Sequence, residues 1–374
     1  MNIGLFVKDF AAGKEFSKDG LPMKSGAEFQ AENHALQLIK KGHNVTIMAK
    51  KRYWFTKARE NINGIDLVRL HAPFRWLEIL IRLFTTHRKI DAFYIIGTPK
   101  FAVWAIIYAK IMHKPVTLSI TIKEEIFDEK ANWRNKILAS CTNYIAISKE
   151  IFEGYHKIGK IDNKKIHLLA HGIDTKKYSK SNPEIKRHLR QKYSIPLKAP
   201  VVVFCARVVL RKGIDTLIKM WPVIFKEMPN AKLIVVGGGK YELLQQLRIL
   251  SKENDDSVIV TGEVPKPQDY YQLSDLYVFP SRSEGLPTSL MEAMSCGLPS
   301  VVSDIGGCED LIVNGENGFR VYSEDTFGFA EKIIYLLNNE DIRQIMSINA
   351  AKYVRENCDY DQVISRLERI LENK

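Results

Sequence analysis

The chain has 374 residues, which is long for a single hydrophobic core and suits two domains. A hydrophobic share of 45% excludes intrinsic disorder, and no run of about 18 uncharged apolar residues is present to form a membrane-spanning helix. The net charge of +12 is uneven: residues 1–177 carry 30 Lys and Arg against 17 Asp and Glu, whereas residues 178–374 carry 25 against 26. This asymmetry predicts that the first half meets an anionic partner surface.

The first residues and the cysteines both favour a cytoplasmic protein. The apolar run that starts at Ile3 is too short for the core of a secretory signal and is better interpreted as a first strand. The five cysteines form no C-x-x-C pair, so we expect reduced, mostly buried thiols and no zinc site.

Short β-branched runs alternate with longer amphipathic segments, a pattern typical of parallel sheets flanked by helices. In the first half the pattern predicts strands at 3–7, 45–49, 92–96, 115–121 and 144–147 and helices at 27–41, 74–85, 101–113 and from residue 148. A polar, Lys-rich stretch at 175–200 then suits an interdomain connection with a short helix inside.

The same rhythm restarts at residue 201. It predicts strands at 201–206, 232–236, 258–261, 276–279 and 300–303, helices at 214–228, 241–251 and 288–296, and helical structure from there to the end. We therefore predict an α/β fold of two facing Rossmann-like, doubly wound domains at 1–177 and 178–357, with a last helix at about 358–374 packing back on the first. Open sheets of this kind bind ligands at the carboxyl ends of their strands.

The most informative segment runs from Pro280 to Pro299 and reads PSRSEGLPTSLMEAMSCGLP. It follows a predicted strand, turns at a glycine and a proline, and opens a helix whose unpaired N–H groups and positive dipole end can hold phosphate. Glu284 in the loop could accept hydrogen bonds from sugar hydroxyls, and Glu292 in the helix could accept both hydroxyls of a ribose. An isolated E-x7-E pair would carry little meaning, because helix surfaces are rich in glutamate.

A pair of cations follows the strand at 201–206. Arg207 offers a planar fork of donors and Lys212 a compact point charge, and both suit phosphate. Taken alone, such a pair is more often solvated charge. Its occurrence together with the glutamates and several glycine turns in the right βα context favours the functional interpretation.

Together these motifs resemble the signature of the family 4 retaining glycosyltransferases, which have the GT-B fold. The resemblance rests on the E-x7-E segment, on R-x4-K-G at 207–213, on the strand-end glycines at 237–239, on Gly262, on D-x-G-G-x-E at 304–309, on the glycine turn at 314–318 and on Gly172-Ile-Asp174. It spans essentially the whole chain and is strongest from 201 to 320.

The resemblance implies three catalytic residues, Glu284, Arg207 and Lys212. The two cations would clamp the donor diphosphate in place of a metal ion, Glu284 would orient the transferred sugar, and Glu292 would bind the ribose. The implied donor site comprises Gly26, Arg207, Lys212, Gly238, Gly262, Glu284, Gly285, Leu286, Pro287, Thr288, Ser289, Leu290 and Glu292.

The first half resembles the family less closely. Ser25-Gly26-Ala27-Glu28 is similar to the family's G-G-x-E loop, but Ser25 replaces the first glycine, so the close approach to donor phosphates falls to Gly26. Family members often carry a histidine at the end of the strand at 115–121, where this chain has Thr121-Ile-Lys123.

No metal ion or other cofactor is expected. The only D-x-D motif, Asp359-Tyr-Asp361, lies near the C-terminus, away from every phosphate motif, and is better suited to cap a helix. Asp304 could in the same way cap the short helix after it, and Gly306 and Gly307 could serve only a tight turn.

Basic and aromatic residues are interleaved at 50–59 and 74–89. This mixture suits a membrane interface, where cations meet lipid headgroups and rings lie at the boundary. The alternative is that 74–89 is simply a core-facing helix with its charges in water. Docking would make the protein peripheral on the inner face of the cytoplasmic membrane.

The predicted function is transfer of a hexose or N-acetylhexosamine from a nucleotide-sugar to a cell-envelope glycan, lipid-linked or polysaccharide acceptor. A UDP-sugar is favoured over a GDP-sugar. A sugar epimerase or phosphorylase of the same fold is the alternative. A nucleic-acid-binding protein is a remote one, because no recognised nucleic-acid module is present and the excess charge lies in the domain without the phosphate motifs.

Overall fold

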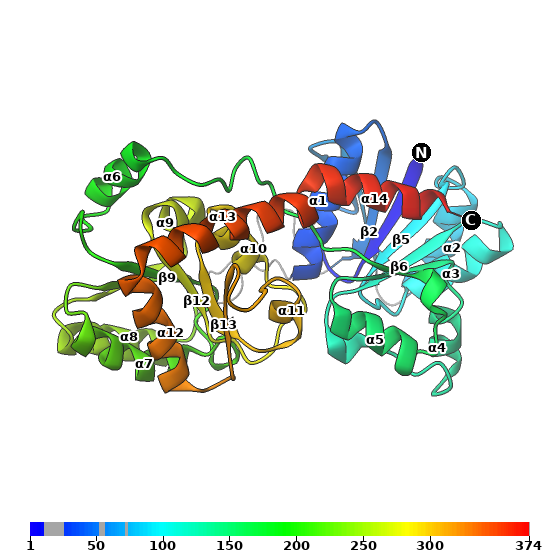
Figure 1. Cartoon of the computed structure of the whole chain (residues 1–374). Coiled ribbons are helices and arrows are strands. Elements are labelled where there is room, and N and C mark those ends of the chain that lie inside the picture. The colour runs from blue at the N-terminus through cyan, green and yellow to red at the C-terminus, as the bar shows by residue number, and fades with distance from the viewer. Residues whose placement is uncertain (11–25, 52–56, 72–73, 374) are drawn as a thin grey trace. The chain divides into compact units, whose positions relative to one another are not determined.

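The structure, a computed structural model, describes residues 1–10, 26–51, 57–71 and 74–373. It forms two compact units, each built around its own sheet (Figure 1). Unit 1 comprises Met1–Gly172 and Tyr360–Lys374, and unit 2 comprises Ile173–Asp359. The chain therefore passes from one unit to the other twice.

Unit 1 has a sheet with the strand order β3-β4-β2-β1-β5-β6-β7-β8. Neighbouring strands are parallel except for the antiparallel edge pair β3–β4. Its elements are β1 (Asn2–Val7), α1 (Gly26–Lys40), β2 (Asn44–Lys50), β3 (Arg59–Ile62), β4 (Ile65–Leu70), α2 (Arg75–Phe84), β5 (Ala92–Ile96), α3 (Ala102–Ile111), β6 (Val116–Ile120), the 3₁₀ turn η1 (Lys123–Glu125), α4 (Trp133–Leu138), β7 (Asn143–Ala146), α5 (Lys149–Lys157), the 3₁₀ turn η2 (Asn163–Lys165), β8 (Ile166–Leu168) and α14 (Tyr360–Glu372).

The core of unit 1 needs the C-terminal helix. Val363, Ile364, Leu367 and Leu371 on α14 are buried with the apolar residues of β1, β2 and β5 and with one side of α1. Figure 1 shows α14 lying beside α1, with both chain termini on this unit. Unit 1 is therefore assembled from the two ends of the chain.

Unit 2 has a fully parallel sheet with the order β11-β10-β9-β12-β13-β14. Its elements are α6 (Pro183–Lys192), β9 (Val201–Cys205), the 3₁₀ turn η3 (Leu210–Lys212), α7 (Ile214–Glu227), β10 (Lys232–Val236), α8 (Tyr241–Glu253), β11 (Val258–Gly262), α9 (Pro267–Leu273), β12 (Leu276–Phe279), α10 (Thr288–Ser295), β13 (Ser300–Ser303), α11 (Gly306–Glu309), β14 (Gly318–Val321), α12 (Thr326–Asn338) and α13 (Glu340–Asn357). Numbered within the unit, the strand order is 3-2-1-4-5-6, which is the Rossmann arrangement. The order in which strands are added to the sheet reverses between β9 and β12. The predicted fold class of two parallel α/β domains is confirmed.

The prediction of helical structure after residue 303 is wrong at one place, because β14 (Gly318–Val321) adds a strand beside β13. This strand is short and pairs on one side only, so its sequence carries little periodic signal. A Cβ at Gly318 would lie 2.4 Å from the Ser300 carbonyl oxygen, which explains the glycine there. The prediction also lacks β3, β4, β8, α4 and α9.

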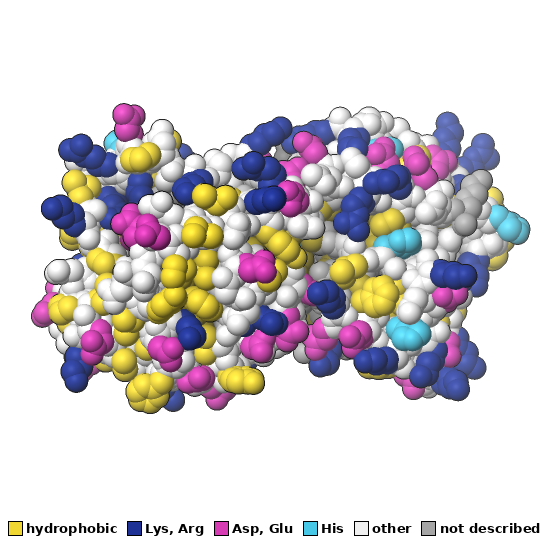
Figure 2. Space-filling model, in the orientation of Figure 1, with side chains coloured by type: hydrophobic (Ala, Val, Ile, Leu, Met, Phe, Trp, Pro, Cys, Tyr) yellow, Lys and Arg dark blue, Asp and Glu magenta, His cyan; other side chains and the backbone are white. Residues whose placement is uncertain are grey.

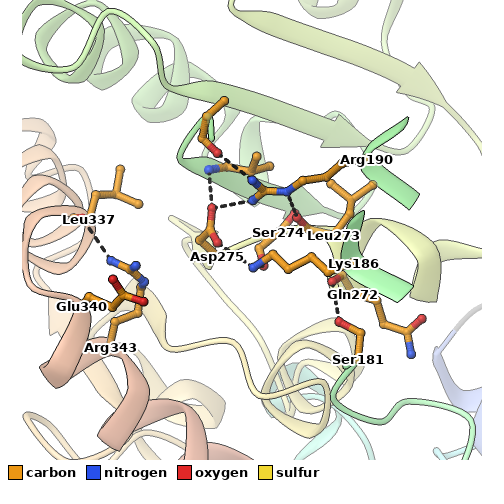
Figure 3. Close-up of polar contacts among 12 residues, drawn as sticks. Ser181, Lys186, Arg190, Gln272, Leu273, Ser274, Asp275, Leu337, Glu340 and Arg343 are labelled. Carbon is orange, nitrogen blue, oxygen red and sulfur yellow. Dashed lines mark hydrogen bonds and ion pairs between the residues drawn. The ribbon is translucent and has the colours of Figure 1, made fainter. Parts of the chain in front are cut away.

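The polar stretch predicted as a connection is part of unit 2. Its helix α6 is tied to the start of β12 by Asp275, which lies between Lys186 and Arg190 (Figure 3). The Asp275 carboxylate is 2.6 Å from Lys186 Nζ and 2.8 Å from Arg190 Nη2, and it also accepts from the Val201 amide at 2.8 Å. Arg190 is buried and donates to the carbonyls of Leu197, Ala199 and Leu273 as well.

Replacing Asp275 by asparagine should lower the free energy of unfolding of unit 2 by about 3 kcal/mol, because it leaves the buried Arg190 without its counter-ion. A urea titration of the purified variant would measure the loss. Asp256→Asn, at an exposed turn, is the matched control and should unfold like the wild type. Equal stability of the two variants would contradict a structural role for the Asp275 network.

Candidate active site

The predicted donor-site residues of unit 2 lie at the carboxyl edge of its sheet. Strands β10, β9 and β12 are neighbours, so the loops that follow them meet. These loops carry the glycines at 237–239, the cations at 207–212 and the glutamate segment at 280–287. The order in which strands are added to the sheet reverses between β9 and β12, where open α/β sheets form their ligand crevice.

The loop after β9 is held tightly against the loop after β12. Gly213 has a φ of 73°, and a Cβ there would lie 1.8 Å from the Pro280 carbonyl oxygen. Any side chain at this position would force the two loops apart. The glycine of the R-x4-K-G motif thus allows the close approach that brings Lys212 to Glu284.

Lys212 and Glu284 form a direct ion pair, with Nζ 2.5 Å from Oε1. The same oxygen accepts a hydrogen bond from the Ser281 hydroxyl at 2.6 Å. The Lys212 ammonium also lies 5.1 Å from the centre of the Phe279 ring. Burial lowers the pKa of Lys212, and Glu284 opposes that shift by favouring the charged form. The two residues predicted to touch different parts of a donor are therefore partners of each other.

Arg207 is exposed, and no hydrogen bond or ion pair of its side chain is found within the described ranges. It is near enough to Lys212 for its positive charge to lower the pKa of that residue. Arg207 thus adds an accessible positive charge at the same edge as Lys212 and Arg211, which lies 3.8 Å from the Glu284 carboxylate, and such a group of cations suits a diphosphate.

Two glycines after β10 let the β9 loop pass close by. A Cβ at Gly237 would lie 2.0 Å from the Ala206 carbonyl oxygen, and one at Gly239 would lie 2.1 Å from that of Val208. The Gly238 carbonyl accepts from the Val208 amide at 2.8 Å. Gly262, at the end of β11, has a φ of 70° and marks a backbone conformation that side chains disfavour. These glycines shape the loops that carry the cations.

Helix α10 begins at Thr288 behind Pro287, and no side chain caps it in the described structure. Leu286, Pro287 and Leu290 are buried and fix the entry of the chain into the helix. A Cβ at Gly307 would lie 2.2 Å from the Gly285 carbonyl oxygen, so α11 packs on the same loop. The Ser289 hydroxyl is 2.8 Å from the Tyr277 hydroxyl. This arrangement presents the helix end that was predicted to hold phosphate.

Asp304 does not cap α11, whose N-cap is Ile305 without a side-chain hydrogen bond. It forms an ion pair with Arg320 on β14 at 3.2 Å. Gly307 serves a close approach of α11 to the Gly285 loop rather than a tight turn alone.

Glu292 is buried inside α10, with 8% of its surface exposed. Burial raises its pKa to about 7, against the effect of hydrogen bonds from Tyr178 and Tyr271. The Tyr271 hydroxyl lies 3.0 Å from Oε2. Sequence reasoning missed these tyrosines and Ser281. Tyr178 lies in the predicted connection, where no pattern marks it, whereas Ser281 is three residues before Glu284 in the same motif.

The raised pKa of Glu292 sets the sign of a pH effect on stability. A carboxyl group whose pKa is higher in the folded state stabilises the fold at low pH, and this contribution is lost as the pH rises from about 4.5 through about 7. Relative to Glu292→Gln, wild-type stability should therefore fall by about 3 kcal/mol between pH 4.5 and pH 8. Urea titrations across this range would test it, and parallel pH profiles of the two proteins would contradict it.

Gly26 opens α1 in unit 1, and a Cβ there would meet nothing within 4 Å. Ser25 lies outside the described residues, as do residues 52–56 of the first basic–aromatic segment. At the position of the family's histidine, Lys123 in η1 forms an ion pair with Glu150 at 2.6 Å.

Within the described ranges, no group of three or more His, Cys, Asp or Glu could hold a metal ion. Asp359 precedes α14 and accepts a hydrogen bond from the Thr175 hydroxyl. Among the residues that the structure describes, no helix is both long and apolar enough to cross a membrane.

Two family models match the chain, one in each half. Residues 24–177 match Glycosyltransferase Family 4, and residues 185–353 match Glycosyl transferases group 1. Among curated relatives, the capsular polysaccharide biosynthesis glycosyltransferase CapM of Staphylococcus aureus is 28% identical over 315 residues, which are 80% of this chain and 81% of CapM.

A second relative is a GDP-mannose-dependent monoacylated α-(1-6)-phosphatidylinositol monomannoside mannosyltransferase of Corynebacterium glutamicum. It is 29% identical over 55% of this chain, and the match spans just 56% of the mannosyltransferase.

The fold is shared with solved glycosyltransferase structures. HepE from Anabaena, in complex with UDP, superposes over 100% of both chains with a TM-score of 0.78 at 19% identity. The two family matches together cover most of the chain, each on one of its two α/β units. The chain therefore belongs to the GT-B-fold glycosyltransferases that pair a family 4 domain with a group 1 domain.

Proposed function

We propose that the protein transfers a hexose or N-acetylhexosamine from a nucleotide-sugar, with retention of anomeric configuration and without a metal ion. The observation that carries the proposal is the Lys212–Glu284 pair at the switch point of unit 2, beside the start of α10. Cations and helix amides suit the diphosphate of a donor, and a carboxylate suits its sugar hydroxyls.

In the proposed reaction, the bond between the anomeric carbon and the β-phosphate oxygen breaks. The acceptor hydroxyl oxygen bonds to the same face of that carbon, and its proton passes to the leaving phosphate oxygen. Lys212 and Arg207 stabilise the charge that builds on the nucleoside diphosphate, and Glu284 orients the sugar.

A calorimetric titration with UDP, GDP and their sugars tests the proposal and identifies the donor. UDP is favoured, since the structurally similar HepE was solved with UDP, but the corynebacterial relative depends on GDP-mannose. Nucleotide release should require an acceptor, and NMR of the first product should show the donor's anomeric configuration. Absence of nucleotide binding would contradict the proposal; acceptor-independent turnover would instead indicate an epimerase, and sugar-phosphate production a phosphorylase.

We further propose that the acceptor is a cell-envelope glycan, lipid-linked or polymeric, and that unit 1 docks on the inner face of an anionic membrane. Helix α2 buries Ile79 and Leu83 but exposes four large hydrophobic side chains, Trp76, Leu77, Ile81 and Phe84, and Phe74 directly before the helix is exposed as well. A hollow of about 420 Å³ lies along this side of the helix. A helix that merely faced the core would not present such a surface.

Positive charge accompanies this exposed apolar side. Arg88 and Lys89, just after α2, are exposed. Figure 2 shows Lys and Arg beside hydrophobic side chains on unit 1. Each such cation near an anionic bilayer contributes about 1 kcal/mol to binding, and the apolar side chains add insertion energy.

Sedimentation with phosphatidylglycerol vesicles tests the docking. The double variant Ile81→Glu, Phe84→Glu should lose at least tenfold in vesicle binding, whereas Ile345→Glu, Ile348→Glu in unit 2 removes similarly exposed side chains and should bind like the wild type. Equal sedimentation of both variants would refute membrane docking through α2.

A further inference from the structure

Three of the five tryptophans of the chain gather on unit 1, each in the first turn of a different helix. Trp76 lies in α2, Trp104 in α3 and Trp133 in α4. Helices α2 and α3 follow strands β4 and β5 directly. For α4, the Arg134 guanidinium fixes the position, since its Nη2 donates to the Thr98 carbonyl just beyond β5 at 2.5 Å. The tryptophans therefore lie at the carboxyl edge of the sheet, where α/β sheets bind ligands.

The three rings form a continuous row. The ring centres of Trp76 and Trp104 are 5.6 Å apart, and those of Trp104 and Trp133 are 6.4 Å apart. The outer two residues are largely open, with Trp76 44% and Trp133 61% exposed. Tryptophans that only filled a core would be covered, so this row leaves aromatic surface open to a partner.

An arginine is the sequence neighbour of each outer tryptophan. Arg75 precedes Trp76 and Arg134 follows Trp133, and the Nε atom of each is buried without a hydrogen-bond partner among the described residues. A buried donor without a partner carries a free-energy penalty that a ligand oxygen would remove. The helices that carry the two outer tryptophans therefore also carry unpaired polar donors.

We propose that the Trp76–Trp104–Trp133 row is the binding platform for the sugar rings of the acceptor glycan. The C–H faces of pyranose rings pack on the indole faces, and hydroxyl or acidic oxygens of the glycan accept from Arg75 and Arg134. Trp76 adjoins the apolar residues of α2 that are proposed to meet the membrane, but Trp104 and Trp133 lie on α3 and α4, so the row continues beyond α2 and a membrane contact through that helix does not explain it. This inference rests on the proposed transferase function, which supplies the need for an acceptor.

The test uses intrinsic tryptophan fluorescence of the full chain, titrated with the lipid-free oligosaccharides that mild acid releases from the envelope of cells that make this protein. The wild type should show a saturable change. Trp76→Ala and Trp133→Ala should each weaken binding about tenfold, and Trp133→Phe should restore most of it. Ile111→Ala, which removes a 61% exposed side chain at the far end of α3, is the matched control and should bind normally.

An unchanged affinity in both Trp→Ala variants, or no saturable change in the wild type, would overturn the platform. The proposal would also be overturned by variants that no longer bind phosphatidylglycerol vesicles but still bind the oligosaccharides, since the row would then be a membrane contact. The titration needs no donor, so its failure is distinguishable from failure of nucleotide binding in unit 2, which calorimetry reports separately.

Discussion

Replacing Lys212 by alanine is expected to slow sugar transfer by about 10² to 10³-fold and to weaken binding of the nucleoside diphosphate. Only 13% of the Lys212 side chain is exposed, and its ammonium lies between Glu284 and the Phe279 ring. A cation held in such partly dry surroundings interacts with a phosphate far more strongly than one in water. Its removal should therefore affect the transition state more than the ground state, and kcat should fall more than the affinity for donor.

Steady-state kinetics and calorimetry with the preferred diphosphate would measure both effects. Lys219→Ala, at an exposed position on α7, is the control and should leave both unchanged. If the Lys212 variant kept wild-type diphosphate affinity and kcat, the assignment of the phosphate site to this edge of unit 2 would fail.

Replacing Glu284 by glutamine is expected to reduce transfer by at least about 10³-fold while making diphosphate binding several-fold tighter. Without a ligand, Glu284 holds the ammonium that a diphosphate needs. Removing its negative charge ends this competition and also removes repulsion of the phosphate. The sugar, however, loses the carboxylate that orients its hydroxyls, so productive alignment is lost.

This variant is distinguished by opposite changes in two quantities, a lower transfer rate and a higher diphosphate affinity. Glu309→Gln, in the same edge region but on α11, supplies a control that also removes one carboxylate charge. Weaker diphosphate binding in Glu284→Gln would show that the pair with Lys212 supports the phosphate site instead of competing with it. Unchanged transfer would remove Glu284 from the catalytic residues.

Much of unit 2 could be predicted from local sequence. The strand–loop–helix pattern around Glu284 and Glu292 is local, and glycines mark the loops where backbones approach closely, as at Gly213 and Gly237. Such signals depend on neighbouring residues in the chain, so they survive without knowledge of the fold. The order of the loops along the sheet edge then follows from the doubly wound topology.

The contacts between distant segments could not be predicted from the sequence. The pair of Lys212 with Glu284 joins residues on two different loops, and the hydrogen bond from Tyr178 to Glu292 starts in a stretch whose polar composition indicated only a connection. Strands β3 and β14 lie at sheet edges, where partial burial weakens the periodic pattern. Their placement depends on packing partners rather than on their own residues.

The two crossings of the chain run side by side, since the Ile173 amide donates to the Cys358 carbonyl and Ile173 forms a bridge with Asp359. In genetic terms, unit 2 is inserted within unit 1. During synthesis the ribosome completes unit 2 first. The apolar face of the unit 1 sheet is covered only after α14 has been synthesised. A chain that stops before Tyr360 would leave that face open to aggregation, and any exchange of donor domains between relatives must keep the last helix with the first half.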